Sequence, residues 1–357
     1  YIQAVERICQ KEKIDTIFPS FDPQVYVFSK NKERFEKMGV LLPIPDYEIV
    51  VTPLDKYRTM QAAQEIGFPC PKTYLPESED DLSRIAEKVG FPAVLKPRFT
   101  SAGRGMAIVR DLPELLEKVR LIRDSQGVPM VQEYIPGRDK PNFNVLLDKK
   151  GDLKVCFYRK TLRYFFKINL NIPTATESMA PPPDGMHVVR LVRELGWWGG
   201  VTVETKTDPR DGILKLMEIN PRLGYGLWRR TELGINEPLM CLKIARGEET
   251  EPVKDYPVGT IILDPMEDML GLVFSLLDLL VYKSCKGLLR MKPLIDPLDR
   301  PTPLKELIQS YRQTWFTDKK RVFNPYFKYF FQDPLVSIIW WFQFFISALR
   351  ATKQLGR

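Results

Sequence analysis

The sequence predicts a mixed α/β protein in which helices alternate with short apolar strands. Helical periodicity at Val5–Glu12 is followed by a short apolar run at Thr16–Ser20, and this alternation recurs along the chain. Further on, two strand-like segments flank a turn of composition Asp-Pro-Arg-Asp-Gly, as in a β-hairpin. The chain has 357 residues and is 44% hydrophobic and 27% charged, so it can form two or three domains with sizeable cores.

Residues 1–54 are predicted to form the end of an α/β unit rather than a whole domain. The helix Val5–Glu12 and the strand Thr16–Ser20 precede a helix at Ser29–Met38, which Gly39 closes. Such alternation favours a parallel sheet, but this segment supplies too few strands for a doubly wound domain. Because the chain lacks an initiator Met and opens within this pattern, we expect its N-terminus to be incomplete.

A strand that ends near a lysine and a glycine-containing loop mark the next part of the chain. Asp55 is suited to cap a helix that runs to Ile66. The buried-type strand Phe91–Pro97 carries Lys96 near its end, and the small-residue loop Thr100–Gly105 leads into a returning strand. The backbone N–H groups of such a flap can surround an anion, although an ordinary glycine-containing hairpin has the same pattern. The loop is not a Walker motif, because it lacks Gly-Lys-Ser/Thr and no helix follows it directly.

The middle of the chain supplies a further helix and three strands. The helix Pro113–Ser125 precedes the strand Met130–Ile135, and two more strands follow at Phe143–Asp148 and Leu153–Tyr158. Basic residues gather just after the last of these strands. This cluster is predicted to be either a solvated face or a patch for substrate anions, and its members are Arg159, Lys160, Arg163 and Lys167.

The strongest chemical signal is an apolar strand that ends in Glu-Ile-Asn-Pro-Arg. Glu218 and Asn220 are two residues apart, so their side chains point to the same face of the strand. The strand Gly200–Thr207 is predicted to pair with this one and to bring Glu204 close to Glu218. Two carboxylates and an amide oxygen suit Mg²⁺ or Mn²⁺ with nucleotide phosphate, and Arg222 could hold a phosphate. A strand end with solvated polar residues is the alternative.

Taken in order, these motifs resemble the ATP-grasp superfamily, in its biotin carboxylase and carbamoyl-phosphate synthetase-like branch. The resemblance covers roughly residues 1–250, in which the lysine, the glycine flap, the strand with a Pro-Gly break, the paired acidic strands and Glu-Ile-Asn-Pro-Arg follow one another. It implies an ATP-grasp domain over residues 55–250, preceded by a partial pre-ATP-grasp (Rossmann-like) domain over residues 1–54. The implied cofactors are ATP and Mg²⁺ or Mn²⁺.

The resemblance also implies roles for individual residues. Lys56 and Lys96 would contact the ATP phosphates, and Arg222 would steady the reacting phosphate or acyl phosphate. The flap over the triphosphate would consist of Ser101, Ala102, Gly103 and Gly105. The hinge strand at the adenine edge would be Gln132, Glu133, Tyr134 and Ile135, with Glu133 at the adenine amino group and Asp139 on the ribose. The magnesium ligands would be Glu204, Glu218 and Asn220.

The implied activity is that of a stand-alone carboxylate–amine ligase, which activates a carboxylate as an acyl phosphate with Mg-ATP and joins it to an amine. After Arg222 the chain reads Leu-Gly-Tyr-Gly-Leu-Trp, unlike the biotin carboxylase continuation, so bicarbonate and biotin are not expected. We find no second grasp copy and no glutaminase-like segment, so we do not expect a whole carbamoyl-phosphate synthetase. The alternatives are a non-catalytic ATP-binding module at a membrane or in an assembly, and a grasp-type kinase.

Charge and cysteine content narrow the expected partners. The net charge of +8 favours anionic partners such as phosphates and nucleotides. A zinc finger, an RNP-type aromatic signature and a long basic run are absent from the sequence, so nucleic acid is not expected. The five cysteines are scattered and are predicted to be free thiols in a reducing compartment, which favours a cytoplasmic protein. We expect small-molecule carboxylate and amine substrates and leave a homodimer open.

Residues 251–357 are predicted to form a helical C-terminal extension beyond the resemblance. The apolar segment Met269–Tyr282 is predicted to be a buried or docking helix. Asp333 and Pro334 open an apolar helix over residues 334–350, which has Lys and Arg on both sides. This helix is shorter than the roughly 20 residues that a bilayer span requires. It is predicted either to contact a membrane surface, peripherally and on the inner face, or to pack on protein.

Overall fold

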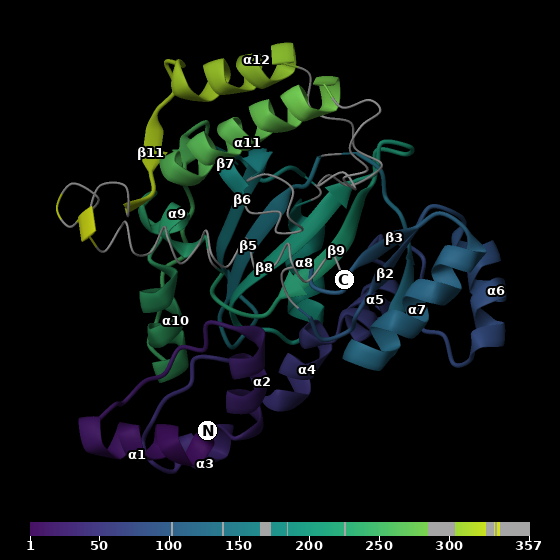
Figure 1. Cartoon of the computed structure of the whole chain (residues 1–357). Coiled ribbons are helices and arrows are strands. Elements are labelled where there is room, and N and C mark those ends of the chain that lie inside the picture. The colour runs from purple at the N-terminus through teal and green to yellow at the C-terminus, as the bar shows by residue number, and fades with distance from the viewer. Residues whose placement is uncertain are drawn as a thin grey trace. The chain divides into compact units, whose positions relative to one another are not determined.

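The computed structural model describes residues 1–100, 103–137, 139–164, 173–183, 185–224, 226–284, 304–325, 332 and 334–335 (Figure 1). The chain divides into two compact units. The first unit contains Tyr1–Arg159 and Ala180–Tyr256, and the second contains Lys160–Met179 and Pro257–Arg357. The predicted mixture of helices and sheets is confirmed, while the predicted boundaries at residues 54 and 250 stay a prediction.

The N-terminal segment of the first unit is helical and nearly without strands. Its helices are α1 Ile2–Glu12, α2 Asp22–Lys30, α3 Lys32–Glu36 and α4 Tyr47–Leu54. The predicted helix over Ser29–Met38 is wrong as one element, because the chain leaves the helix at Asn31, whose side chain donates to the Val27 carbonyl oxygen. Among the described residues here, the parallel pairing that the alternation predicted is reduced to one bridge between Thr16 and Leu41.

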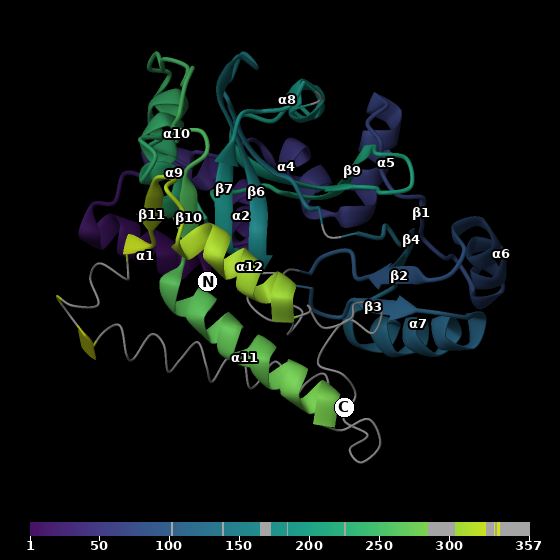
Figure 2. The same cartoon turned by 90° about the horizontal axis from the view of Figure 1, so that it is seen from above.

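A small antiparallel sheet forms next in the first unit. Its strands are β1 Thr73–Tyr74, β2 Ala93–Lys96, β3 Ala107–Val109 and β4 Met130–Glu133, in the spatial order β1-β4-β2-β3. The predicted hairpin around the glycine loop is confirmed, because β2 and β3 pair. The helices α6 Glu79–Val89 and α7 Leu112–Gln126 share one apolar core with this sheet (Figure 2).

A larger antiparallel sheet carries the acidic strands. In the first unit β5 Asn142–Leu147 lies between β6, which begins at Leu153, and β8 Gly199–Thr207, while β9 Leu214–Asn220 pairs with β8. The helices α5 Lys56–Ile66 and α8 Gly185–Glu194 join one face of these strands in a common core, which includes Met60, Val189, Val203 and Ile219. Side chains alternate along a strand, so the opposite face is free to carry polar groups. The helices α9 Leu227–Thr231 and α10 Glu237–Arg246 follow β9.

The second unit combines the end of β6, which runs to Tyr164, with C-terminal elements. The strand β7 Pro173–Met179 pairs antiparallel with β10 Ile261–Leu263, and β10 pairs parallel with β11 Arg321–Phe323. The apolar helix predicted from Met269 is confirmed and is longer, because α11 spans Pro265–Ser284. Among the described residues, α12 Leu304–Trp315 follows.

The apolar helix predicted over residues 334–350 lies outside the described residues, apart from Pro334 and Leu335. Across the described ranges, none of the helices combines the length and the apolar character needed to traverse a bilayer.

Candidate nucleotide and metal site

The predicted acidic pair forms across two neighbouring strands. In the β8–β9 pair Glu204 lies directly opposite Glu218, and Thr202 lies opposite Asn220. The Asn220 side-chain amide donates a hydrogen bond of 3.1 Å to Glu204 Oε1. The intervening Val203 and Ile219 face the apolar core, so the polar groups share the other face of the sheet. The register therefore places two carboxylates and an amide side by side, as predicted.

The two carboxylates of the acidic pair disfavour each other's ionisation. The pKa of Glu204 is raised because surrounding protein atoms desolvate its carboxylate, although the side chain still reaches solvent, and because the carboxylate of Glu218 lies nearby. The positive charges of Arg159, Lys140 and Arg222 oppose this rise. On Glu218, Oε1 is 2.9 Å from Lys56 Nζ, so a lysine ammonium partly neutralises the pair.

Lys56 is fixed by a clamp between the start of α5 and the chain after β2. Asp55 is buried and accepts a hydrogen bond from the backbone N–H of Tyr57, which makes it the N-cap that the sequence predicted. The guanidinium of Arg98 donates two hydrogen bonds to the Asp55 carboxylate. The Lys56 backbone N–H donates to the Arg98 carbonyl oxygen at 3.2 Å, and Lys56 Nζ donates to the Thr100 carbonyl oxygen. These contacts fix the position of the Lys56 backbone, and so the point from which its side chain extends towards Glu218.

Lys96, at the end of β2, is the second predicted phosphate-binding lysine. Its side chain is buried, and burial lowers its pKa to about 8 despite the favourable charge of Glu218. The charge of Lys56 acts in the same direction as burial. An anionic ligand beside these lysines would therefore stabilise the protonated form of Lys96, against both its burial and its repulsion from Lys56.

Arg222 follows the acidic strand and has partners on both sides. Its Nε donates to Asp22 Oδ1 at 2.7 Å, and its Nη2 donates to Asn220 Oδ1 at 3.3 Å. Asp22 lies in the first turn of α2, 200 residues earlier in the sequence. Sequence reasoning missed Asp22. The local sequence indicates only that this residue begins a helix, and it does not indicate a contact with Arg222.

Sequence reasoning also missed the role of Arg98, and it named Arg159 only as a member of the basic cluster. Arg159 is buried in β6, opposite Asn142, and its charge lowers the pKa of Glu204. In the predicted basic cluster, Arg163 is not available to substrate anions, because it donates two hydrogen bonds to Asp268 within the second unit. Lys167 lies outside the described residues.

The glycine flap is described only in part. Ser101 and Ala102 lie outside the described residues, whereas Gly103 and Gly105 follow them in the hairpin between β2 and β3. Both glycines have positive φ, at 67° and 72°, which explains the choice of residue in this turn. A Cβ on Gly105 would also meet the side chain of Gln126.

The predicted hinge residues lie at the end of β4 and directly after it, and the structure shows contacts from three of their side chains to other parts of the first unit. Gln132 is buried and donates to Thr73 Oγ1 at 2.9 Å, while its Oε1 has no partner among the described residues. The Glu133 carboxylate binds the Arg210 guanidinium, and the ring of Tyr134 lies 5.4 Å from Lys206 Nζ. The Ile135 carbonyl oxygen accepts a hydrogen bond from Lys206. The hinge is therefore tied to the β8–β9 hairpin.

Asp139, the predicted ribose contact, lies beside the end of β8 rather than in the acidic pair. Its Oδ2 accepts a hydrogen bond of 2.7 Å from Thr207 Oγ1, and its carbonyl oxygen accepts from the Thr207 backbone N–H. The carboxylate therefore already has one partner among the residues that the structure describes.

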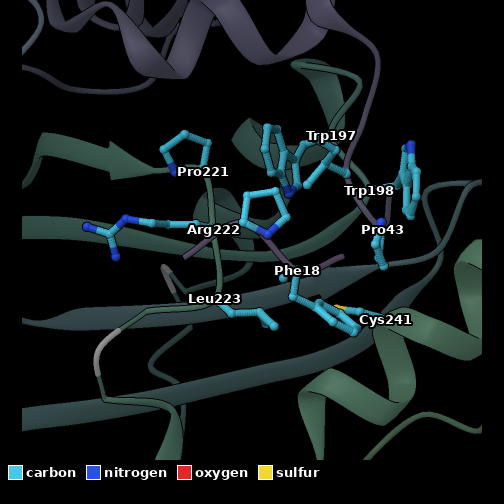
Figure 3. A pocket seen from close by; sticks show the side chains of 11 residues that line it. Phe18, Pro43, Trp197, Trp198, Pro221, Arg222, Leu223 and Cys241 are labelled. Atoms are coloured by element: carbon cyan, nitrogen blue, oxygen red, sulfur yellow. The ribbon is translucent and has the colours of Figure 1, made fainter. Parts of the chain in front are cut away.

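A small apolar pocket adjoins Arg222 (Figure 3). Apart from Arg222, its lining is apolar or small and comprises Phe18, Pro19, Pro43, Ile44, Trp197, Trp198, Gly200, Pro221, Leu223 and Cys241. Burial raises the pKa of the Cys241 thiol to about 12, so this thiol is not a nucleophile at neutral pH. In Figure 3 the guanidinium of Arg222 extends away from the tryptophan rings.

The donor set fits a hard divalent cation. Glu204, Glu218 and Asn220 carry oxygen atoms on one face of the sheet, and a cation between the two facing carboxylates would offset their mutual repulsion. No group of three or more His, Cys, Asp or Glu residues that could hold a metal occurs within the part of the chain that the structure describes. Phosphate oxygens or water would therefore have to complete the coordination shell, as is usual for Mg²⁺.

This fold and this arrangement of lysines, flap and acidic strands define an ATP-grasp protein. The chain belongs to the family described as the carbamoyl-phosphate synthase L chain, ATP binding domain, whose model matches residues 55–249 and thus more than half of the chain. Residues 1–43 match the model of the PylC-like N-terminal domain. The family resemblance seen in the sequence is confirmed.

Relatives of known function share part of the chain. The carbamoyl phosphate synthase large chain of Pseudomonas putida is 25% identical over 236 residues, which are 62% of this chain and 22% of that one. The N-terminal section of the large chain from Aquifex aeolicus is 23% identical over 231 residues, 61% of this chain and 42% of that one. This chain therefore spans less than half the length of these relatives.

Solved structures share the fold. The biotin carboxylase domain of 2-oxoglutarate carboxylase from Hydrogenobacter thermophilus, solved with MgADP, ADP and bicarbonate, has a TM-score of 0.62 and 20% identity, over 72% of this chain and 60% of that one. The biotin carboxylase of Campylobacter jejuni has a TM-score of 0.64 and 18% identity, over 73% of this chain and 60% of that one.

Proposed function

We propose that the protein is an ATP-dependent ligase that activates a carboxylate as an acyl phosphate and joins it to an amine. The observation that carries this proposal is the convergence of Glu204, Glu218 and Asn220 with Lys56, supported by membership of an ATP-binding family. The relatives named carbamoyl phosphate synthase and biotin carboxylase support the reaction class.

In the proposed reaction, a substrate carboxylate oxygen attacks the γ-phosphorus of ATP. The bond from that phosphorus to the β,γ-bridging oxygen breaks, so ADP leaves and an acyl phosphate remains. The amine nitrogen then attacks the acyl carbon, inorganic phosphate departs, and the nitrogen loses a proton. The products are an amide, ADP and phosphate.

The charged residues would lower the cost of bringing these anions together. Lys56 and Lys96 would hold the phosphates, and Arg222, oriented by Asp22, would face the charge that develops on the transferred phosphoryl group. Magnesium held by Glu204, Glu218 and Asn220 would supply further neutralisation of phosphate charge.

The remaining predicted residues would enclose the nucleotide. We propose that the flap with Gly103 and Gly105, together with Ser101 and Ala102, covers the triphosphate and keeps water from the acyl phosphate. Backbone groups of Gln132, Glu133, Tyr134 and Ile135 would read the adenine edge, and the second oxygen of Asp139 would accept from the ribose.

The proposal is tested by replacing Glu218 with Gln. We expect the variant to lose Mg-dependent release of ADP when wild-type protein is screened against pooled carboxylates and amines, and to bind Mn²⁺ more weakly by electron paramagnetic resonance. Glu194→Gln, which removes an exposed carboxylate paired with Arg190 on the surface of α8, is the matched control. Undiminished turnover in Glu218→Gln would refute this site, and a stable phosphorylated product without amide would identify a kinase instead.

We also propose that small-molecule carboxylates and amines are the substrates of a cytoplasmic enzyme, and we leave a homodimer open. The membrane-surface contact predicted for residues 334–350 is a proposal that rests on the sequence alone. Flotation with anionic liposomes, with and without residues 333–357, would decide it, and equal behaviour of the two chains would end the idea.

A further inference from the structure

The turn between β8 and β9 carries an ion-pair network outside the acidic site. Asp208, at the start of this turn, is fully buried. Its carboxylate accepts hydrogen bonds from the Arg210 backbone N–H at 3.0 Å, from Arg210 Nε at 2.9 Å and from Lys215 Nζ at 2.6 Å. These bonds, led by those from the Arg210 guanidinium, hold the pKa of Asp208 well below its usual range, so the carboxylate stays ionised. The guanidinium of Arg210 is therefore held in one orientation.

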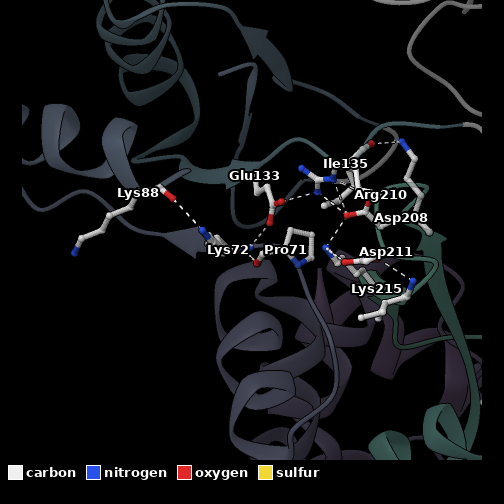
Figure 4. Close-up of polar contacts among 12 residues, drawn as sticks. Pro71, Lys72, Lys88, Glu133, Ile135, Asp208, Arg210, Asp211 and Lys215 are labelled. Carbon is white, nitrogen blue, oxygen red and sulfur yellow. Dashed lines mark hydrogen bonds and ion pairs between the residues drawn. The ribbon is translucent and has the colours of Figure 1, made fainter. Parts of the chain in front are cut away.

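The same guanidinium reaches the end of β4 (Figure 4). Arg210 Nη2 lies 2.6 Å from Glu133 Oε1, while it also donates to Asp208 Oδ2 at 2.5 Å. The other carboxylate oxygen of Glu133 accepts from the Lys72 backbone N–H at 3.2 Å, and the Glu133 N–H donates to the Lys72 carbonyl oxygen at 2.8 Å. Both oxygens of Glu133 thus have protein donors.

We propose that Arg210 is a positioning residue that latches the hinge strand to the β8–β9 turn through the carboxylate of Glu133. In this arrangement the Glu133 side chain does not read the adenine amino group, because both of its oxygens accept from protein donors. Its carboxylate instead fixes the end of β4, so that the backbone of the hinge presents a constant edge to the base. The inference rests on the proposed nucleotide binding for its effect on affinity, but the latch itself is a property of the nucleotide-free protein.

Two features distinguish this latch from an ordinary surface ion pair. Glu133 is largely covered, with 16% of its side chain exposed, and Asp208 anchors Arg210 from a fully buried position. A second cation supports the same strand, because Lys206 of β8 donates to the Ile135 carbonyl oxygen. The hinge is therefore held at two points by residues of one hairpin.

The test compares Arg210→Met, Glu133→Ala and the double variant. The dissociation constants of Mg-ATP and Mg-ITP are measured by titration calorimetry, because ITP lacks the amino group of adenine. We expect each single variant to weaken both nucleotides by the same factor, about two- to fivefold, which is the scale of a partly exposed ion pair. The double variant should be no weaker than the worse single variant, and Arg210→Lys should recover part of the loss.

Hydrogen exchange of the nucleotide-free proteins provides the second readout. We expect amides of residues 133–137 to exchange faster in Arg210→Met and Glu133→Ala. The matched control is Arg120→Met, which removes an exposed ion pair with Glu79 between α6 and α7 and should leave both exchange in the hinge and nucleotide affinity unchanged.

Three results would overturn the latch. These are unchanged exchange in Arg210→Met, a loss of preference for ATP over ITP confined to Glu133→Ala, and single effects that multiply in the double variant. If wild-type protein bound neither nucleotide, the proposed function would fall, while the exchange rates would still decide whether Arg210 holds the hinge strand.

Discussion

The buried ammonium of Lys96 is the residue whose chemistry the surroundings change most usefully. Its pKa lies near 8 instead of 10.5 because burial disfavours the charge. The folded state therefore binds fewer protons than the unfolded state between about pH 8 and 10.5, and this penalty is relieved as the pH rises through that window. A phosphate beside the ammonium would reverse the shift.

We therefore predict that nucleotide binding takes up protons near pH 8. Half of the Lys96 side chains are neutral at that pH, so a bound triphosphate should draw in up to about half a proton per site. Calorimetry in buffers of different ionisation enthalpy measures this uptake, and Lys96→Met should abolish it. If Lys96→Met takes up as many protons as the wild type, a group other than Lys96 binds the proton.

A second prediction at the residue scale concerns Asp22. Replacing it with Asn removes the charge that orients the Arg222 guanidinium, and a hydrogen bond between charged groups is worth about 1.5–3 kcal/mol. We expect kcat for ADP release to fall roughly tenfold or more while KM for ATP changes little, because Asp22 acts through Arg222.

Asp22→Glu should recover part of the lost rate, since it restores the carboxylate. Asp46→Asn, which removes one of the carboxylates that pair with Lys32 in the same N-terminal segment, is the matched control and should leave kcat unchanged. An equal loss in Asp46→Asn would point to a general effect on that segment.

At the scale of elements, the start of α5 is joined to the chain after β2 by one buried carboxylate. Asp55→Ala would remove both the N-cap and the partner of Arg98, so we expect the free energy of unfolding to fall by about 2–3 kcal/mol. Asp55→Asn can still cap the helix and loses only the ion pair with Arg98, so it should cost about 1–2 kcal/mol. Urea denaturation measures both values.

The difference between the two Asp55 variants measures the contribution of the helix cap, because only Asn keeps it. Asp46 is the N-cap residue of α4 but makes no side-chain cap bond, so Asp46→Ala should cost far less than Asp55→Ala. Equal losses for Asp55→Asn and Asp55→Ala would mean that the ion pair with Arg98, rather than the cap, holds the two elements together.

At the scale of the whole molecule, the second unit is built from two distant parts of the sequence. Asp268 of α11 is fully buried and accepts hydrogen bonds from Arg163 of β6, Thr174 of β7 and Trp315 of α12. The unit therefore depends on a carboxylate that joins Lys160–Met179 to the C-terminal elements.

We predict that Asp268→Ala lowers the stability of the second unit by about 3–5 kcal/mol, because it leaves Arg163 buried without its carboxylate. Hydrogen exchange in β7 and α12 measures the change within this unit. Lys319→Met, which removes a half-exposed lysine paired with the mostly covered Glu177 of β7, is the control and should have a much smaller effect, because solvent screens the lysine charge. Unchanged exchange in Asp268→Ala would show that packing alone holds the unit.

Much of the first unit follows from local sequence. The N-cap Asp55, the hairpin around Gly103 and Gly105, and the two-residue spacing of Glu218 and Asn220 are each specified within a few neighbouring residues. The helix over Ser29–Met38 was predicted wrongly, because a side-chain bond at Asn31 outweighs the helical period. Short strands such as β1 and β10, with two and three residues, carry too little periodicity to be recognised.

The sequence by itself determined the family, the acidic strand pair and the lysines, because motifs of fixed local spacing in a fixed order specify them. Only the tertiary structure decided which charges meet. Asp22 with Arg222, Asp268 with Arg163, and Arg210 with Glu133 are separated by 77 to 200 residues. Such pairs leave no local pattern, since nothing in the neighbouring sequence distinguishes each residue from any other charged residue. The fold makes them partners by bringing distant strands and helices together.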